Sequence, residues 1–132
     1  MLLVSIVDDT PKDATALKKC VEEYCKRNDL EPIIRVFRGA MDFFNSGVYY
    51  HDIIFIDVQM KTIDGLETAR SLRMDDDNRE TILILVTDTA QFELKEDDLD
   101  ILDTIVKPVS LASVTCVMDK ALKRLGGGRA IS

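Results

Sequence analysis

Three aspartates follow apolar runs at two places in the sequence. Asp8 and Asp9 come after residues 2–7, and Asp57 comes after residues 53–56. An acid that closes a buried strand lies where the sheet ends and solvent begins, so acids at two such ends can meet in one small volume. Two unit charges about 4 Å apart repel by roughly 4 kcal/mol at an effective dielectric constant near 20. A hard divalent cation that prefers oxygen would relieve this repulsion, so the sequence predicts a Mg²⁺ site held by the three carboxylates.

Two further polar side chains close apolar runs. Thr87 follows residues 81–86, and Lys107 follows residues 104–106. Phosphoryl transfer to a carboxylate would use every one of these groups. Asp57 would be the nucleophile, Thr87 would donate a hydrogen bond to a phosphoryl oxygen, and Lys107 would pair first with Asp57 and then with the phosphoryl group. Mg²⁺ would neutralise charge on the attacking and transferred oxygens.

Taken singly, these signals are weak. An acidic pair after a strand is more often a turn or a helix cap, and a Lys-Pro pair is by itself a loop signal. It is the joint placement of all four signals at strand ends that favours the phosphoacceptor interpretation.

Short apolar runs alternate with segments of helical period along the chain. This predicts an α/β fold, a doubly wound five-stranded parallel sheet with helices on both faces. Ligands of such sheets bind beyond the carboxyl ends of the strands. Strands are expected at 2–8, 33–37, 52–57, 81–87 and 104–106, and helices at 11–27, 39–46, 64–74, within 88–100, and after Ser110.

Helix-start signals support these boundaries. Thr10 is expected as an N-cap with Pro11 at the first helical position. Asp64 and Glu67 have the spacing of a capping box, and Ser110 is expected to cap the last helix.

The chain has 132 residues, which fits one domain. We expect that domain to span residues 1–125 and the glycine-rich stretch 126–132 to be a flexible tail or linker stump. The net charge of −7 argues against direct nucleic-acid binding, because neutralisation of phosphates supplies most of that affinity. The first apolar run breaks at Asp8, so it is neither a signal peptide nor a membrane span.

The cysteines Cys20, Cys25 and Cys116 are odd in number and widely spaced. They are expected to be free thiols in a reducing environment, so a cytoplasmic location is predicted.

The order of these features resembles the receiver domain of bacterial two-component response regulators, over essentially the whole chain. The residues that carry the resemblance are Asp8-Asp9, Asp57-Val58-Gln59-Met60 followed by Asp64-Gly65, Thr87, and Lys107-Pro108. None is specific alone, but their order at successive strand ends is. The stretch 56–70 looks most like receivers of LytTR-type transcription regulators.

The resemblance implies a flavodoxin-like receiver fold with strand order 2-1-3-4-5. It implies that a sensor histidine kinase or a small phosphodonor phosphorylates Asp57, and that the backbone carbonyl of Gln59 joins Asp8, Asp9 and Asp57 around Mg²⁺. Thr87 would move toward the phosphoryl group. The only chemistry implied is autophosphorylation and autodephosphorylation, so whether the protein is an enzyme stays open.

The signal would leave through the surface made by the fourth helix, the fifth strand and the last helix. It would reach an effector domain or a partner protein, and for the LytTR type a transcriptional effector. A phosphorylation-dependent dimer is also implied.

The chain departs from the family pattern at several positions. Lys61 stands where a proline is usual, Asp88 where a small residue is usual, and Thr104 where an aromatic switch residue is usual. Gln59 and Thr89 lie two residues beyond Asp57 and Thr87, at positions that the family uses to tune phosphoryl lifetime. We treat these five residues as candidate modulators.

Three alternatives belong to other functional classes. Lys61, Asp88 and Thr104 motivate a degenerate receiver that acts as a phosphorylation-independent interaction module. A phosphatase of the haloacid-dehalogenase type is disfavoured, because Gln59 stands where that family has a second aspartate. A flavodoxin-like cofactor carrier is disfavoured, because the first strand ends in Asp-Asp rather than in a phosphate-binding loop.

Overall fold

The computed structural model describes residues 1–61, 63–75, 78–89 and 99–128. Strands and helices alternate up to β4, as the sequence predicts. The elements are β1 (Leu2–Val7), α1 (Pro11–Arg27), β2 (Pro32–Phe37), α2 (Ala40–Phe44), β3 (Ile53–Asp57), α3 (Gly65–Met74), β4 (Ile82–Thr87), β5 (Ile101–Val106) and α4 (Leu111–Gly128).

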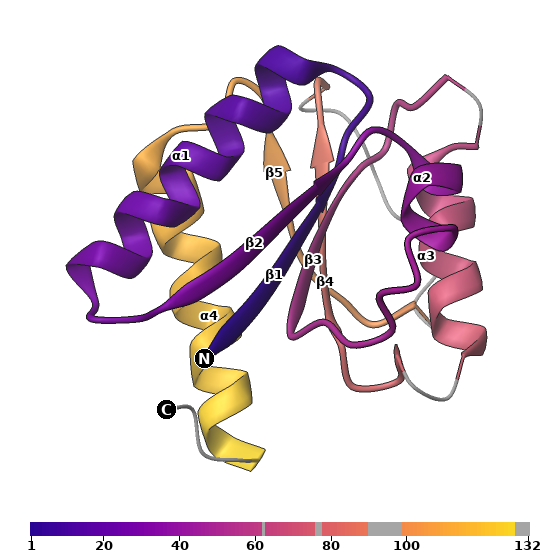
Figure 1. Ribbon diagram of the computed structural model, residues 1–132. Coiled ribbons are helices and arrows are strands. Elements are labelled where there is room, and N and C mark those ends of the chain that lie inside the picture. Colours follow the sequence, from indigo (N-terminus) through magenta and orange to yellow (C-terminus); the bar gives the residue numbers. More distant parts are fainter. Residues whose placement is uncertain (62, 76–77, 90–98, 129–132) are drawn as a thin grey trace.

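The strands form one parallel sheet in the order β2-β1-β3-β4-β5, which confirms the expected fold and strand order. Helices α1 and α4 cover one face of the sheet, and α2 and α3 cover the other (Figure 1). The strand order reverses between β1 and β3, so the carboxyl ends of these two strands lie side by side at the switch point.

The core is divided by the sheet into two layers. Along β4, Ile82, Ile84 and Val86 face the α1 and α4 layer, whereas Leu83 and Leu85 face the α3 layer. All five side chains are buried, as expected for a central strand covered on both faces. Burial of each such side chain contributes about 1.5–3 kcal/mol, so β4 and the similarly buried β3 form a rigid base for the residues at their ends.

Strand β5 begins at Ile101, three residues earlier than the expected Thr104. Asp103 interrupts the apolar run, which is why the sequence pattern missed the first half of the strand. In the structure its carboxylate lies 2.6 Å from Lys120 Nζ of α4, so the polar side chain is accommodated at the sheet edge. A register shift between Leu83 and Ile84 of β4 lets both halves of β5 pair.

The helix starts follow the sequence signals with one difference. The Asp64 carboxylate accepts a hydrogen bond from Glu67 N at 2.9 Å, and Ser110 Oγ accepts one from Ser113 N at 3.1 Å. Thr10 is the N-cap of α1, but its side chain makes no capping hydrogen bond. The Asp8 carboxylate instead accepts from Thr10 N at 2.9 Å, which ties the start of α1 to the end of β1.

Helix α4 continues to Gly128, past residue 125 where the domain was expected to end. A glycine in a helix costs only about 1 kcal/mol relative to alanine, so a long packed helix can carry its last turn into such a stretch. The helix expected within 88–100 falls largely on residues 90–98, outside the described part. Among the described residues, no helix is long and apolar enough to cross a membrane.

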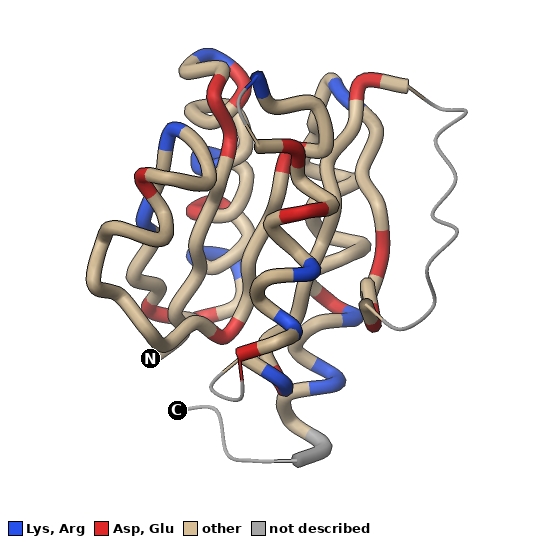
Figure 2. The backbone as a smooth tube through the Cα atoms, turned by 90° about the vertical axis from the view of Figure 1, so that its right-hand side faces the viewer, with Lys and Arg blue, Asp and Glu red and all other residues tan. Residues whose placement is uncertain are grey.

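Acidic and basic residues are interspersed over the helices and loops rather than separated into two faces in the view of Figure 2.

Candidate functional site

Asp8, Asp9 and Asp57 come together at the carboxyl ends of β1 and β3. Each residue contributes one carboxylate oxygen to a group whose members lie within 4.8 Å of one another. Asp8 and Asp57 are almost fully buried, with 4% and 2% of their surface exposed. The convergence follows from the pairing of Val7 with Ile56, which places the next residue of each strand at the same edge.

The loop after β3 holds Asp57 in place. The Asp57 Oδ1 atom accepts a hydrogen bond from Gln59 N at 3.1 Å. The first residue of α3, Gly65, packs directly on this loop: a Cβ atom added there would overlap the Asp57 carbonyl and lie 2.9 Å from Val58 Cα. The chain thus brings the start of α3 against the end of β3 only because residue 65 has no side chain.

Lys107, which follows β5, directs its ammonium group at three carboxylates. Its Nζ lies 3.3 Å from Asp8 Oδ2, 3.3 Å from Asp57 Oδ2 and 2.8 Å from Asp13 Oδ2. The pairing with Asp57 matches the expected position of Lys107. The contact with Asp13 was missed, because in the sequence that residue has the ordinary role of an acid in the first turn of a helix.

Burial dominates the electrostatics of Asp57. It raises the pKa of the carboxyl group, the charge of Asp8 raises it further, and Lys107 and the Gln59 N–H oppose them, so that the pKa reaches about 6. Burial also disfavours the Lys107 ammonium, but the hydrogen bond to Asp13 and the charges of Asp8 and Asp57 outweigh it and raise the pKa of Lys107. The lysine therefore stays charged at neutral pH, and Asp57 is ionised above about pH 6.

Thr87 is fully buried at the end of β4, and its hydroxyl group is in contact with Gln59. Gln59 Nε2 donates to Thr87 Oγ1 at 2.9 Å, and Gln59 Oε1 accepts from Asp88 N at 3.2 Å. Thr87 Oγ1 also accepts from Thr89 N at 3.3 Å. Two of the candidate modulators, Gln59 and Thr89, thus touch the hydroxyl that the proposed chemistry would use.

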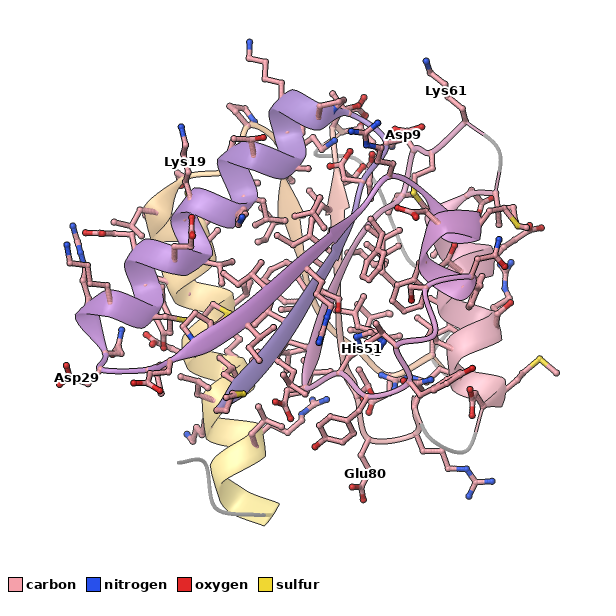
Figure 3. All side chains as sticks on the ribbon, viewed as in Figure 1. Asp9, Lys19, Asp29, His51, Lys61 and Glu80 are labelled. Atoms are coloured by element: carbon pink, nitrogen blue, oxygen red, sulfur yellow. The ribbon has the colours of Figure 1, made fainter. Side chains whose placement is uncertain are left out.

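The other departures from the family pattern are Lys61, Asp88 and Thr104, and of these Lys61 contacts an acid of the cluster. The Lys61 N–H donates to Asp9 Oδ2 at 2.9 Å, while its side chain extends away from Asp9 into solvent (Figure 3). Asp88 is exposed, and Thr104 is half-buried in β5, paired with Leu85.

Residues 4–119 match the family model of the response regulator receiver domain. The chain belongs to this family. The resemblance to the receiver domain is thereby confirmed, which is consistent with a role in two-component signalling. Two curated relatives of the receiver are longer proteins, and the receiver spans about a third of their length.

The first relative is the cyclic di-GMP phosphodiesterase response regulator RpfG of Xanthomonas campestris. It is 29% identical over 115 residues, which cover 82% of this receiver and 28% of the relative. The second is the sensory transduction protein LytT of Oceanobacillus iheyensis. It is 26% identical over 77 residues, which cover 58% of this receiver and 31% of the relative.

Solved structures share the fold of this receiver. The response regulatory domain of protein mrkE from Klebsiella pneumoniae superimposes with a TM-score of 0.78 at 18% identity, covering 96% of this chain and 99% of that one. The response regulator TrrA from Thermotoga maritima, solved in complex with Mg²⁺ and BeF, has a TM-score of 0.74 at 22% identity, covering 92% and 99%.

The acid cluster of the receiver has the donor chemistry of a magnesium site. Mg²⁺ prefers carboxylate and carbonyl oxygens and keeps several waters. The three converging carboxylates provide such oxygens, and Asp9 among them is partly exposed. The residues present therefore fit this ion.

Proposed function

We propose that this receiver accepts a phosphoryl group on Asp57 in a Mg²⁺-dependent reaction, from a sensor histidine kinase or a small phosphodonor. The observation that carries the proposal is the geometry of Lys107, whose ammonium lies 3.3 Å from the buried Asp57 while Asp8 and Asp9 converge on the same carboxylate. A structural ion pair would not need the two further acids at this point.

In the reaction, an ionised Asp57 oxygen forms a bond to phosphorus as the bond from phosphorus to the donor breaks, and the leaving group keeps that electron pair. Lys107 neutralises charge on the transferred group. Thr87 donates a hydrogen bond to a phosphoryl oxygen, which requires its hydroxyl group to leave the hydrogen bond that it now donates to Gln59 Oε1 at 3.3 Å.

Asp8, Asp9 and Asp57, with the backbone carbonyl of Gln59, would hold the metal. When bound, Mg²⁺ neutralises negative charge on the attacking and transferred oxygens. The TrrA structure, a complex with Mg²⁺ and BeF, supports this assignment by its similar fold.

We further propose that phosphorylation shifts the receiver between two conformers. Nearly two negative charges are added at Asp57, which would reorganise the contacts of Thr87 and Lys107 at the ends of β4 and β5. The signal would leave through β5, α4 and the segment between β4 and β5 to an effector domain or a partner protein, with dimerisation on phosphorylation as one route. A transcriptional effector is proposed from the LytTR-type resemblance. A cytoplasmic location is proposed from the three free cysteines, Cys20, Cys25 and Cys116.

The test is incubation of the protein with acetyl phosphate and Mg²⁺, followed by intact-mass measurement. We expect an adduct of about 80 Da, the mass of one phosphoryl group, and its loss in Asp57→Asn and in the presence of EDTA. Asp42→Asn, which changes an exposed acid on α2, is the matched control and should retain the adduct. A folded protein that binds Mg²⁺ but forms no adduct would instead indicate the degenerate interaction module.

A further inference from the structure

Asp13 makes the shortest of the three contacts of Lys107. Its Oδ2 lies 2.8 Å from Lys107 Nζ, against 3.3 Å for both Asp8 and Asp57. Asp13 belongs to the first turn of α1, whereas the other two acids follow strands. Its side chain is 38% exposed, so it holds the ammonium from the solvent side while Asp8 and Asp57 hold it from the buried side.

Asp13 stands apart from the metal cluster. The carboxylate oxygens that converge within 4.8 Å belong to Asp8, Asp9 and Asp57, and among the described residues Asp13 is not part of that group. Its charge is therefore directed at the lysine and not at the expected ion.

An ammonium group has three N–H donors, and here three carboxylates already face them. A phosphoryl group on Asp57 would bring new oxygens to Lys107, and each needs a donor that now points to a carboxylate. It would also bring nearly two negative charges toward the Asp13 carboxylate, which repels them.

We propose that Asp13 competes with the phosphoryl group for Lys107 and so limits how tightly this receiver holds a phosphoryl group. The inference rests on the proposed function of Asp57. Asp13 acts through Lys107, so it is a positioning residue. Without its charge, Lys107 keeps its contacts with Asp8 and Asp57 and gains a donor for the phosphoryl oxygens.

The experiment is a calorimetric titration of the protein with beryllofluoride, a non-covalent stand-in for the phosphoryl group, at saturating Mg²⁺. Asp13→Asn removes the charge with little change of shape, and Asp13→Glu keeps the charge. Glu22→Gln is the matched control, because it makes the same change of net charge at an exposed position nine residues further along α1, about 13 Å away along the helix axis.

Asp13→Asn should bind beryllofluoride about 3- to 10-fold more tightly than the wild type, the range expected from loss of one partly exposed competing ion pair. Asp13→Glu and Glu22→Gln should stay within about twofold of the wild type. Asp13→Ser, which removes the whole carboxylate, is a second charge-removing variant and should behave as Asp13→Asn. Circular dichroism verifies that each variant is folded.

The proposal is overturned if Asp13→Asn and Asp13→Ser bind like the wild type or more weakly, or if Glu22→Gln gives an equal gain. Failure of the proposed function looks different: in that case the wild-type receiver does not bind beryllofluoride in the presence of Mg²⁺. If the wild type binds beryllofluoride and the Asp13 variants bind it no more tightly, the competition by Asp13 is excluded, but the proposed function of Asp57 is not.

Discussion

Asp57 illustrates how a single residue carries both the chemistry and an energetic cost. It is 2% exposed and faces Asp8, so its ionisation is opposed by burial and by a like charge. Lys107 offsets only part of the cost of ionising Asp57, because its ammonium group also pairs with Asp8 and Asp13. The carboxylate is therefore in an environment that a cation improves, which is the physical reason to expect metal binding there.

Asp57→Asn should stabilise the protein without metal at neutral pH. The folded-state pKa of Asp57 is about 6, above the ordinary value of 3.8, so the folded state binds this proton more tightly than the unfolded state. Stability is then lost as the pH rises from about 4 to about 6, by up to about 3 kcal/mol. Urea unfolding at pH 7.5 in EDTA should give a free energy of unfolding about 1–3 kcal/mol higher for the variant. A less stable variant would contradict this electrostatic account.

Gln59 holds the Thr87 hydroxyl through its side-chain amide, at 2.9 Å. Gln59→Ala should free that hydroxyl to turn toward a phosphoryl group, and one net hydrogen bond of about 0.5–1.5 kcal/mol corresponds to roughly 2- to 10-fold tighter beryllofluoride binding in Mg²⁺. A double-mutant cycle with Thr87→Ala checks whether Gln59 acts through the Thr87 hydroxyl group. If the gain persists in the absence of the Thr87 hydroxyl, Gln59 does not act through it.

At the scale of elements, two contacts fix the position of α3. Its first residue, Gly65, packs on the carbonyl of Asp57, and Arg73 in its last turn donates to backbone carbonyls beyond the helix. The Arg73 guanidinium lies 2.7 Å from Leu99 O and 2.7 Å from Thr81 O, and it also reaches the carbonyls of Asn78, Arg79 and Asp100. The helix is thus anchored to the site at one end and to the starts of β4 and β5 at the other.

Gly65→Ala should damage the site through the backbone. The added Cβ would overlap the Asp57 carbonyl, so the start of α3 or the end of β3 must shift, at a cost of about 1–3 kcal/mol or more. We expect weaker Mg²⁺ binding together with the loss of stability. Gly39→Ala is the control, because a Cβ there meets nothing within 4 Å, and its extended backbone suits any residue. Equal behaviour of the two variants would disprove the packing argument.

Arg73→Lys should destabilise the fold although it preserves the charge. A lysine cannot reproduce the planar fork of donors, so several buried carbonyls lose their partners, at about 1–3 kcal/mol for each buried group left unsatisfied. Denaturant unfolding measures the loss. Arg27→Lys, in the exposed pair with Glu23, should change stability by less than about 0.5 kcal/mol. Similar values for both variants would show that the carbonyl contacts contribute little.

For the molecule as a whole, Asp57 and His51 are two buried titratable residues that lie at opposite ends of β3 and respond oppositely to pH. His51 precedes β3 and is buried, with Nδ1 2.6 Å from Ser5 Oγ and Nε2 3.3 Å from Val48 O. It lies inside the molecule, away from the end that carries Asp9 (Figure 3). Burial lowers its pKa, the Val48 carbonyl opposes this, and the charge of Arg35 lowers it further.

Acid should therefore unfold the protein in part through His51. Because its folded-state pKa lies below the ordinary value of 6.5, the unfolded state binds the proton more tightly, and stability is lost as the pH falls below about 6.5. Titration of Asp57 changes the stability in the opposite direction between about pH 4 and 6, and would mask the effect of His51. The measurement is therefore made in the Asp57→Asn variant. There, unfolding free energies should fall from pH 7 to pH 5, and His51→Gln should flatten the profile. An unchanged slope would exclude His51 as the cause.

The sequence by itself determined the fold class, the strand order through its family resemblance, and the acids and the lysine of the site. The local periodicity of apolar residues predicts buried strands and amphipathic helices. A parallel sheet then brings the residues that end its strands to one edge. Asp8, Asp9, Asp57 and Lys107 each end such a run, so their meeting could be expected from position alone.

Only the tertiary structure decided which side chains share Lys107, what anchors α3 and where His51 lies. Asp13 and Lys107 are 94 residues apart, and Ser5 and His51 are 46 apart. No periodic pattern encodes these pairs, because they depend on the direction in which a helix turn or a loop presents one side chain after packing. In their local sequence context, Asp13 is an acid in the first turn of a helix, Arg73 is an arginine near the end of a helix, and His51 is a loop histidine.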